Sequence, residues 1–246
     1  MADAAAAFSR IDLNTHALLL DVDGTLLDIA PRPDLVVVPS GLIDDLQRLH
    51  DLSGGAVAFV SGRKIAVMDA LFTPLLLPAV GVHGAEMRVG RSSIERRAEP
   101  LPVLLRQQLV DGANALGLLS EDKEISVTIH FRLAPDKEKE AEALAARGCR
   151  DFAAEALHIE RNKMIVEIMR RGINKGAGIE ALMTRAPFAG RIPVFVGDDA
   201  TDEKGFAAVS RLGGMAFSIG RDFPGLGGIF PDPAAFRATL RALAKA

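Results

Sequence analysis

Two aspartates with the spacing of a reactive pair follow the first apolar run of the chain. Asp21 and Asp23 stand on either side of Val22, and Gly24 and Thr25 come next. In extended backbone, residues two apart face the same way, so both carboxylates can point into one small volume. Two like charges that close are costly unless a cation or a proton lies between them. The pair therefore predicts a site that handles a cation, a proton or both.

Carboxylates in this arrangement suit phosphate ester hydrolysis. Asp21 is the candidate nucleophile, which would form and then release an aspartyl-phosphate. Asp23 is the candidate general acid for the leaving group, and it would activate water in the second step. Mg²⁺ prefers oxygen ligands in octahedral geometry, and we expect it to bind an Asp21 oxygen, the Asp23 backbone carbonyl and an Asp198 oxygen.

The transferred phosphoryl group carries spread negative charge, so positive and hydrogen-bond-donating groups should surround it. Thr25, Ser61 and Lys175 are the available donors. Each follows a predicted strand or begins a predicted helix, where backbone N–H groups add to anion binding.

Short apolar runs place these residues. Four runs end in polar clusters and read as buried strands: 17–20, 56–60, 79–82 and 192–196. Helical patterns lie between them, at 41–49, 65–71 and 175–184. The alternation predicts an α/β fold with a doubly wound parallel sheet, whose ligands bind beyond the carboxyl ends of the strands. All the polar clusters fall at that edge.

The middle of the chain has a different pattern. Predicted helices at 103–116 and 136–148 alternate irregularly with strand-like segments at 125–133, 153–159 and 164–169. This irregular order indicates an inserted α+β cap domain. We expect core segments at 1–101 and 172–246, with the cap at 102–171 between them.

Composition narrows the class of partner. The net charge is −3, and basic and acidic residues are interspersed, so nucleic acid is not an expected partner. Cys149 is the only cysteine, and no apolar run is long enough to cross a membrane, which together predict a cytoplasmic protein without a membrane partner. Tyr and Trp are absent, so polar and charged side chains would have to bind a sugar.

Taken singly, these motifs carry little information. An isolated Asp-x-Asp-Gly is most often a turn, Ser-Gly-Arg is common, and Gly-Asp-Asp after a strand is usually a solvated loop. Their occurrence in order, each just beyond a predicted strand or at the start of the next helix, is what indicates one site.

In that order the motifs resemble those of phosphatases of the haloacid dehalogenase superfamily. The four matching segments are 21–27, Ser61-Gly62-Arg63, Lys175-Gly176 and 197–203. The last reads Gly-Asp-Asp-Ala-Thr-Asp-Glu and is similar to the version found in the trehalose-6-phosphate phosphatase family. Further matches at 81–86, 128–132 and 212–215 extend the similarity over most of the chain.

The resemblance implies Mg²⁺-dependent hydrolysis of trehalose 6-phosphate to trehalose and phosphate, with a cap that closes over the core and recognises the sugar. It implies catalytic roles for Asp21, Asp23 and Lys175, and metal binding by Asp21, Asp23 and Asp198. It also implies a set of substrate-binding residues, which comprises Thr25, Ser61, Gly62, Arg63, His83, Glu121, Lys123, His130, Arg132 and Glu167.

Some positions depart from the family pattern and leave alternatives open. Met169 and Arg170 stand where Lys-Pro is common, and Phe131 stands where Tyr is common. His83 suits either a role at the boundary of core and cap or a loop histidine bonded to nearby backbone. The nearest alternative function is a phosphatase for sucrose phosphate or a mannosyl phosphate. A silent binding domain would be expected to lack one of the three aspartates, and a phosphomutase would yield an isomerised sugar phosphate.

Overall fold

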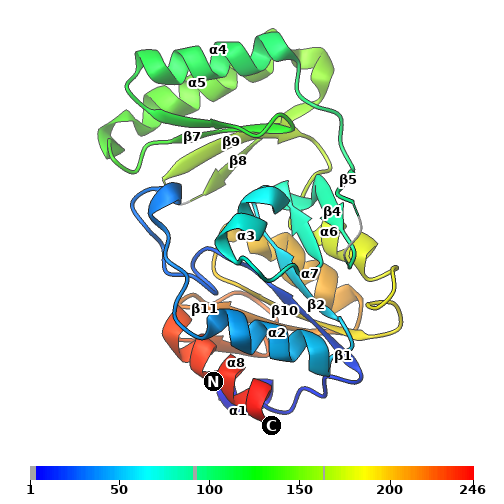
Figure 1. The fold of residues 1–246 in the computed structure, drawn as a ribbon. Coiled ribbons are helices and arrows are strands. Elements are labelled where there is room, and N and C mark those ends of the chain that lie inside the picture. The colour runs from blue at the N-terminus through cyan, green and yellow to red at the C-terminus, as the bar shows by residue number, and fades with distance from the viewer. Residues whose placement is uncertain (1–3, 91–92, 163) are drawn as a thin grey trace. The chain divides into compact units, whose positions relative to one another are not determined.

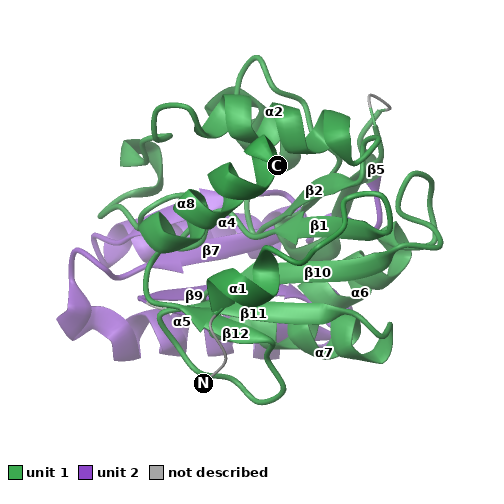
Figure 2. Cartoon of the chain, turned by 90° about the horizontal axis from the view of Figure 1, so that it is seen from below, with its two compact units in different colours: residues 1–95, 174–246 green, residues 96–173 purple. Residues whose placement is uncertain are grey.

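A computed structural model describes residues 4–90, 93–162 and 164–246. The chain divides into two compact units (Figures 1 and 2). Unit 1 combines residues 1–95 with 174–246, and unit 2 is the intervening segment 96–173. The sequence analysis placed these boundaries after residues 101 and 171.

An eight-stranded sheet forms the centre of unit 1. Its strands, in spatial order, are β12 (Gly228–Phe230), β11 (Met215–Ile219), β10 (Ile192–Gly197), β1 (His16–Leu20), β2 (Val57–Val60), β3 (Ala79–Gly81), β4 (Glu86–Arg88) and β5 (Glu95–Arg96). Neighbours from β12 to β3 run parallel, and β4 is antiparallel to β3. The parallel sheet predicted from the apolar runs is confirmed, and an antiparallel edge is added to it.

Helices cover both faces of this sheet (Figure 2). On one face lie α1 (Ala4–Phe8), α2 (Leu42–Leu52), α3 (Ile65–Leu71) and α8 (Pro233–Lys245), whose apolar residues pack against alternate strand residues such as Leu18 and Leu20. On the other face α6 (Lys175–Leu182) and α7 (Glu203–Arg211) pack against Leu19 and Phe195. Because both faces are buried, the strands read as continuous apolar runs.

The central strand pair of the sheet joins the two segments of unit 1. β1 lies between β2 and β10, with Leu20 opposite Val196. The backbone continues from these positions into Asp21 and Asp198, at the same edge of the sheet. Parallel pairing therefore places residues from both segments of unit 1 beside each other.

Unit 2 is a four-stranded antiparallel sheet with two helices (Figure 1). Its strands, in spatial order, are β6 (Leu119–Asp122), β7 (Ser126–His130), β9 (Ile165–Arg170) and β8 (Leu157–Asn162). Val127, Ile129, Val166 and Ile168 face α4 (Val103–Ala115) and α5 (Glu138–Asp151) and form a separate apolar core with them. The other face carries a row of polar residues in register, which are Glu121, Thr128, Glu167 and Glu160.

The structure corrects several predicted elements. The expected strand at 153–159 begins only at Leu157, after a 3-10 turn at Ala153–Glu155. The strand expected over 125–133 ends at His130. β6 was not predicted, because its residues are half-exposed or exposed and include two carboxylates, which hides the strand in the sequence pattern.

Candidate active site

Asp21 is held by donors on both of its carboxylate oxygens. The Nζ of Lys175 donates to Oδ1 at 2.8 Å, and the Thr25 hydroxyl donates to Oδ2 at 3.1 Å. All three side chains are buried. Lys175 is the first residue of α6, which Asn174 caps by accepting from the Ala177 N–H. The structure thus joins three predicted site residues from two distant segments of the chain.

Asp202 is a member of this cluster that the sequence analysis assigned no role. Its Oδ1 accepts from Lys175 Nζ at 2.7 Å, and its Oδ2 accepts from the backbone N–H groups of Asp198 and Asp199 at 3.0 and 3.1 Å. Its side chain is fully buried. The sequence signal was its position four residues after Asp198, from which a carboxylate can reach back to cap the turn.

Three carboxylates converge at this edge of the sheet. Oxygens of Asp21, Asp198 and Asp202 lie within 4.8 Å of one another, and all three residues are buried. This set of hard oxygen donors fits a divalent cation such as Mg²⁺. The predicted ligands Asp21 and Asp198 belong to it, whereas the side chain of Asp23 lies elsewhere.

Gly24 makes room for Asp198. The residue has φ +83°, and a Cβ there would lie 2.2 Å from Oδ2 of Asp198. Only glycine adopts this conformation easily and leaves that space open. The Asp-x-Asp-Gly motif therefore requires its glycine for both the turn and the close approach.

Burial dominates the electrostatics of Asp21, the candidate nucleophile. It raises the pKa of Asp21 to about 7; the Lys175 charge opposes this rise and the Asp198 charge adds to it. Burial lowers the pKa of Lys175, but the charges of Asp202 and Asp21 outweigh it and raise that pKa well above its ordinary value. Lys175 is therefore a permanent cation, while Asp21 needs a further positive charge to be fully ionised at neutral pH.

Asp23 is paired with Arg63. The Nε of Arg63 donates to Oδ2 at 2.6 Å, and Nη2 donates to Oδ1 at 2.7 Å. Arg63 was expected to bind substrate, but its guanidinium contacts the candidate general acid. The partner could not be read from the sequence because 40 positions separate the two residues.

The remaining predicted core residues form the turn around Arg63. Ser61 is buried, and its Oγ accepts from the Arg63 N–H at 3.2 Å. The ring of His83 fills the space where Gly62 lacks a Cβ, since such an atom would lie 2.4 Å from His83 Nε2. Nearby, Glu86 accepts from the Ile65 N–H at 2.9 Å.

The predicted sugar-binding residues of unit 2 cluster on the polar face of its sheet. Glu167 is buried, and its Oε1 accepts from Lys123 Nζ at 3.1 Å and from the Ser126 hydroxyl at 2.5 Å. Glu121 lies 3.2 Å from His130 Nε2. Arg132 is half-buried just beyond β7.

Among the described residues of this face, one buried hydroxyl has no hydrogen-bond partner. It belongs to Thr128, which lies opposite both Glu121 and Glu167 in the sheet register. The sequence analysis gave Thr128 and Ser126 no role.

The departures from the family pattern lie in unit 2. Phe131 is buried in the apolar core of that unit. Met169 is buried, and Arg170 makes an ion pair with Glu155 at 2.7 Å. These contacts give all three residues a structural role in unit 2.

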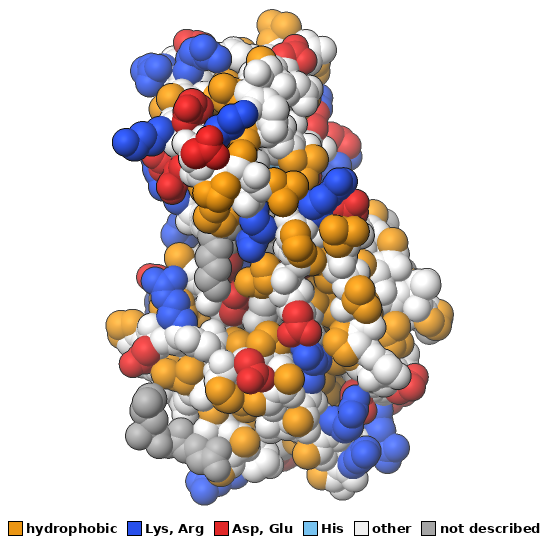
Figure 3. All heavy atoms as spheres, turned by 90° about the vertical axis from the view of Figure 1, so that its left-hand side faces the viewer, with side chains coloured by type: hydrophobic (Ala, Val, Ile, Leu, Met, Phe, Trp, Pro, Cys, Tyr) orange, Lys and Arg blue, Asp and Glu red, His pale blue; other side chains and the backbone are white. Residues whose placement is uncertain are grey.

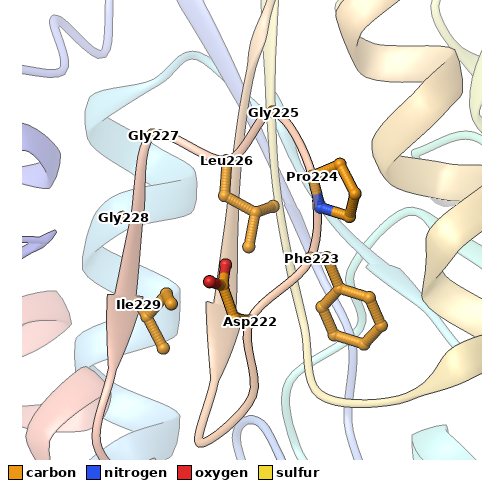
Figure 4. A pocket seen from close by; sticks show the side chains of 8 residues that line it. All are labelled: Asp222, Phe223, Pro224, Gly225, Leu226, Gly227, Gly228 and Ile229. Atoms are coloured by element: carbon orange, nitrogen blue, oxygen red, sulfur yellow. The ribbon is translucent and has the colours of Figure 1, made fainter. Parts of the chain in front are cut away.

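A cavity of about 300 Å³ lies apart from these residues, in the loop between β11 and β12 (Figure 4). Its lining runs from Asp222 to Ile229, and Asp222 is the one charged residue in that segment. The cavity contains none of the predicted site residues.

Two surface properties bear on partners. Figure 3 shows one face of the molecule on which basic and acidic side chains are interspersed with apolar ones. Within the described part of the chain, no helix combines the length and the apolar character that crossing a bilayer requires.

Comparison with solved structures supports the fold. The C-terminal domain of a Candida albicans trehalose-6-phosphate phosphatase has a TM-score of 0.82 at 19% identity, covering 98% of this chain and 95% of that one. A phosphatase of the haloalkanoate (HAD) superfamily from Bacteroides thetaiotaomicron has a TM-score of 0.63 at 17% identity, covering 96% and 98%. At these identities the likeness concerns the fold alone.

Sequence comparison defines the family. The profile of the Trehalose-phosphatase family matches residues 19–223. A probable trehalose-phosphate phosphatase of Sinorhizobium fredii is 42% identical over 242 residues, covering 95% of this chain and 89% of that protein. The trehalose-6-phosphate phosphatase of Escherichia coli is 43% identical over 208 residues, covering 83% and 77%. The chain therefore belongs to the trehalose-phosphatase family, within the haloacid dehalogenase superfamily.

Proposed function

We propose that this protein hydrolyses trehalose 6-phosphate to trehalose and inorganic phosphate, in a cytoplasmic step of trehalose biosynthesis. The observation that carries the proposal is the buried cluster in which Lys175 contacts both Asp21 and Asp202, with Asp198 beside them. The substrate is suggested by two relatives named as trehalose-phosphate phosphatases, which are 42% and 43% identical to this chain over the aligned residues.

The first step transfers the phosphoryl group to Asp21. A carboxylate oxygen of Asp21 attacks phosphorus, the bond from phosphorus to the sugar oxygen breaks, and that oxygen takes a proton from Asp23. The products are trehalose and an aspartyl-phosphate. In the second step water attacks phosphorus and Asp23 takes a proton from that water. The bond between phosphorus and Asp21 breaks, which releases phosphate and regenerates the Asp21 carboxylate.

The chain's own groups prepare these steps. Lys175 and Thr25 orient the two oxygens of Asp21, so the nucleophile needs little reorganisation. Lys175 is also a permanent positive charge close to where negative charge develops. Mg²⁺ held by Asp21, Asp198 and the Asp23 carbonyl would neutralise phosphate charge when bound. We assign sugar recognition to the polar face of unit 2, where Glu121, Lys123 and Glu167 lie.

The test is phosphate release from a panel of phosphate esters. We expect trehalose 6-phosphate to be preferred over glucose 6-phosphate, sucrose 6-phosphate and a mannosyl phosphate, and activity to require Mg²⁺. Asp21→Asn should fold and be inactive, because an amide cannot serve as the attacking anion. A preference for sucrose phosphate or a mannosyl phosphate would contradict the assigned substrate and leave the proposed reaction mechanism unchanged. Activity of more than a few per cent in pure Asp21→Asn would contradict the nucleophile assignment.

A further inference from the structure

The ion pair between Arg63 and Asp23 occupies both oxygens of the candidate general acid. Its two hydrogen bonds are 2.6 and 2.7 Å long and come from one planar guanidinium. The Arg63 side chain is only 12% exposed, while that of Asp23 is 38% exposed. A two-point contact of this kind fixes the direction of a carboxylate as well as its place.

The pairing separates Asp23 from the other acids of the site. Asp21, Asp198 and Asp202 form the carboxylate cluster, and the Asp23 side chain is directed to Arg63 instead. Arg63 also lies 3.4 Å from the carbonyl oxygen of Pro33. The guanidinium is thus committed to protein groups, which argues against a direct role in holding phosphate.

Backbone contacts fix the turn that carries Arg63. Its carbonyl accepts from the Val82 N–H at 2.9 Å, and the Ser61 carbonyl accepts from the His83 N–H at 3.0 Å. The His83 ring lies against Gly62, between these two contacts. Residues 82 and 83 therefore contact each of the three residues of the 61–63 turn.

The residues that hold the turn are themselves strained. Val82 has φ +45° and His83 has φ +54°. Positive φ is rare for any residue with a side chain, and for β-branched valine it is a true outlier. Conformations of this kind persist where the surroundings fix them, and they concentrate at functional sites.

We propose that Arg63 is the positioning residue of Asp23, and that the strained Val82–His83 turn fixes Arg63 for this purpose. The inference deepens the proposed function, because it takes Asp23 as the acid of that reaction. One hydrogen bond, from Nε to Oδ2, can persist while Oδ1 leaves Nη2 and faces the sugar oxygen of the substrate. The freed Oδ1 takes up a proton from solvent, and Asp23 gives that proton to the sugar oxygen as the bond to phosphorus breaks, while Nε continues to hold Oδ2.

The decisive measurement is how the rate depends on the leaving group. Rapid-quench measurement of aspartyl-phosphate formation would compare trehalose 6-phosphate with aryl phosphates of increasing leaving-group acidity. In Arg63→Ala we expect a loss of about 10- to 100-fold for the sugar phosphate, part of the ~10²- to 10⁴-fold that general acid catalysis supplies. The ester of the most acidic phenol has a leaving group that needs little protonation, so its rate of aspartyl-phosphate formation should fall by less than about threefold. Arg63→Lys, which keeps one contact, should recover part of the loss.

Several results would overturn this role. Equal losses across the series would make Arg63 a structural or phosphate-binding residue. A raised KM with unchanged kcat would return it to substrate binding, and full activity would remove its role altogether. If wild-type protein forms no aspartyl-phosphate, the proposed function fails; if it does and Arg63→Ala shows no added dependence on the leaving group, only the positioning role fails.

Arg88→Ala is the matched control. Arg88 also makes a two-point contact with a carboxylate, because its Nη1 and Nη2 donate to Asp69 at 2.6 and 2.7 Å, and Nη2 donates to the Leu77 carbonyl as well. Its loss should lower the melting temperature without changing the dependence on the leaving group. A changed dependence in Arg88→Ala would show that any lost ion pair produces the signature, and would contradict the proposal.

Gly62→Ala tests the part played by the strained turn. The new methyl group conflicts with the His83 ring and should displace the 61–63 turn. We expect the rate of aspartyl-phosphate formation to fall selectively for poor leaving groups, as in Arg63→Ala, but by a smaller factor. A uniform loss, or none, would limit the positioning role to Arg63 and refute the role of the turn.

Discussion

Lys175 lies 2.8 Å from Asp21, so the candidate nucleophile is ion-paired with a side chain of its own chain. Both side chains are nearly inaccessible, and the same ammonium group lies 2.7 Å from Asp202. One cation thus compensates two buried carboxylates. The contribution of this lysine to stability and its contribution to catalysis can be measured separately, by unfolding and by turnover.

Replacing Lys175 should destabilise the fold as well as stop turnover. Lys175→Met leaves Asp21 and Asp202 buried without their cation, and breaking such a buried pair costs about 3–5 kcal/mol. Urea unfolding should show this loss at pH 7. The matched control is Arg211→Ala, whose exposed pair with Glu180 should be worth at most about 1 kcal/mol. Equal losses in the two variants would contradict a dominant role of buried charge.

Mg²⁺ binding should weaken as the solution becomes more acidic. A metal must displace the proton from Asp21, whose pKa is raised to about 7. That carboxyl is mostly ionised at pH 8 and mostly protonated at pH 6, so the apparent affinity should fall about tenfold between them. Calorimetry in two buffers of different ionisation enthalpy would also detect the proton released at pH 6.

Asp21→Asn is the control for this measurement. The amide has no proton to lose in this range, so the part of the pH dependence due to residue 21 should vanish while overall affinity drops. An affinity in the wild type that is the same at pH 6 and pH 8 would be incompatible with Asp21 as a ligand of raised pKa.

A methyl group at Gly24 should disable the site. Gly24→Ala combines the backbone cost of positive φ, about 1–2 kcal/mol, with a 2.2 Å conflict against Asp198. We expect loss of activity and of stabilisation by Mg²⁺. Gly190→Ala has nearly the same φ, +81°, and open space around it, so it should lose stability alone. Retained activity in Gly24→Ala would show that Asp198 can move without consequence.

Substitutions on the polar face of unit 2 should affect substrate specificity without affecting the chemical steps. Lys123→Ala or Glu167→Ala should lower kcat/KM for trehalose 6-phosphate by about tenfold or more, since a charged hydrogen bond is worth ~1.5–3 kcal/mol. Remote binding energy also serves turnover, so kcat should fall as well. Hydrolysis of p-nitrophenyl phosphate, which has no sugar, should change little.

Two comparisons sharpen that test. Glu142→Gln removes the charge of an ion pair in the same unit, in which Glu142 Oε1 lies 2.7 Å from Arg161 Nε. This variant should hydrolyse both substrates at the wild-type rate. A parallel fall for both substrates in Glu167→Ala would mean that this residue supports the fold, and the recognition role would be withdrawn.

The sequence predicted the central strands well because burial on both faces gives them an unmistakable pattern. The run 192–196 differs from β10 by a single residue at its end. β6 escaped prediction because three of its four side chains are polar and all four are at least partly exposed. Patterns of burial therefore revealed the strands that position the candidate nucleophile, and missed one that carries a candidate sugar-binding residue.

Contacts between the predicted site residues were harder to predict than the strands that carry them. Asp21, Lys175 and Asp198 were identified as one site because parallel strands must bring their carboxyl ends together. The partner of Arg63 depends on the exact path of two turns, which no local pattern encodes. The same holds for Glu167, whose contact with Ser126 follows from strand register.

The pairing of β1 with β10 has a consequence for the newly made chain. Asp21 and Lys175 are separated by 154 positions, with all of unit 2 between them. During synthesis the candidate nucleophile Asp21 emerges long before Lys175, so we expect a nascent polypeptide to lack phosphatase activity until the second segment has left the ribosome and β10 has paired with β1. A cut within unit 2 divides the catalytic set between two fragments, neither of which holds it whole. Activity recovered on mixing such fragments would therefore report that the central pairing had re-formed between separate polypeptides.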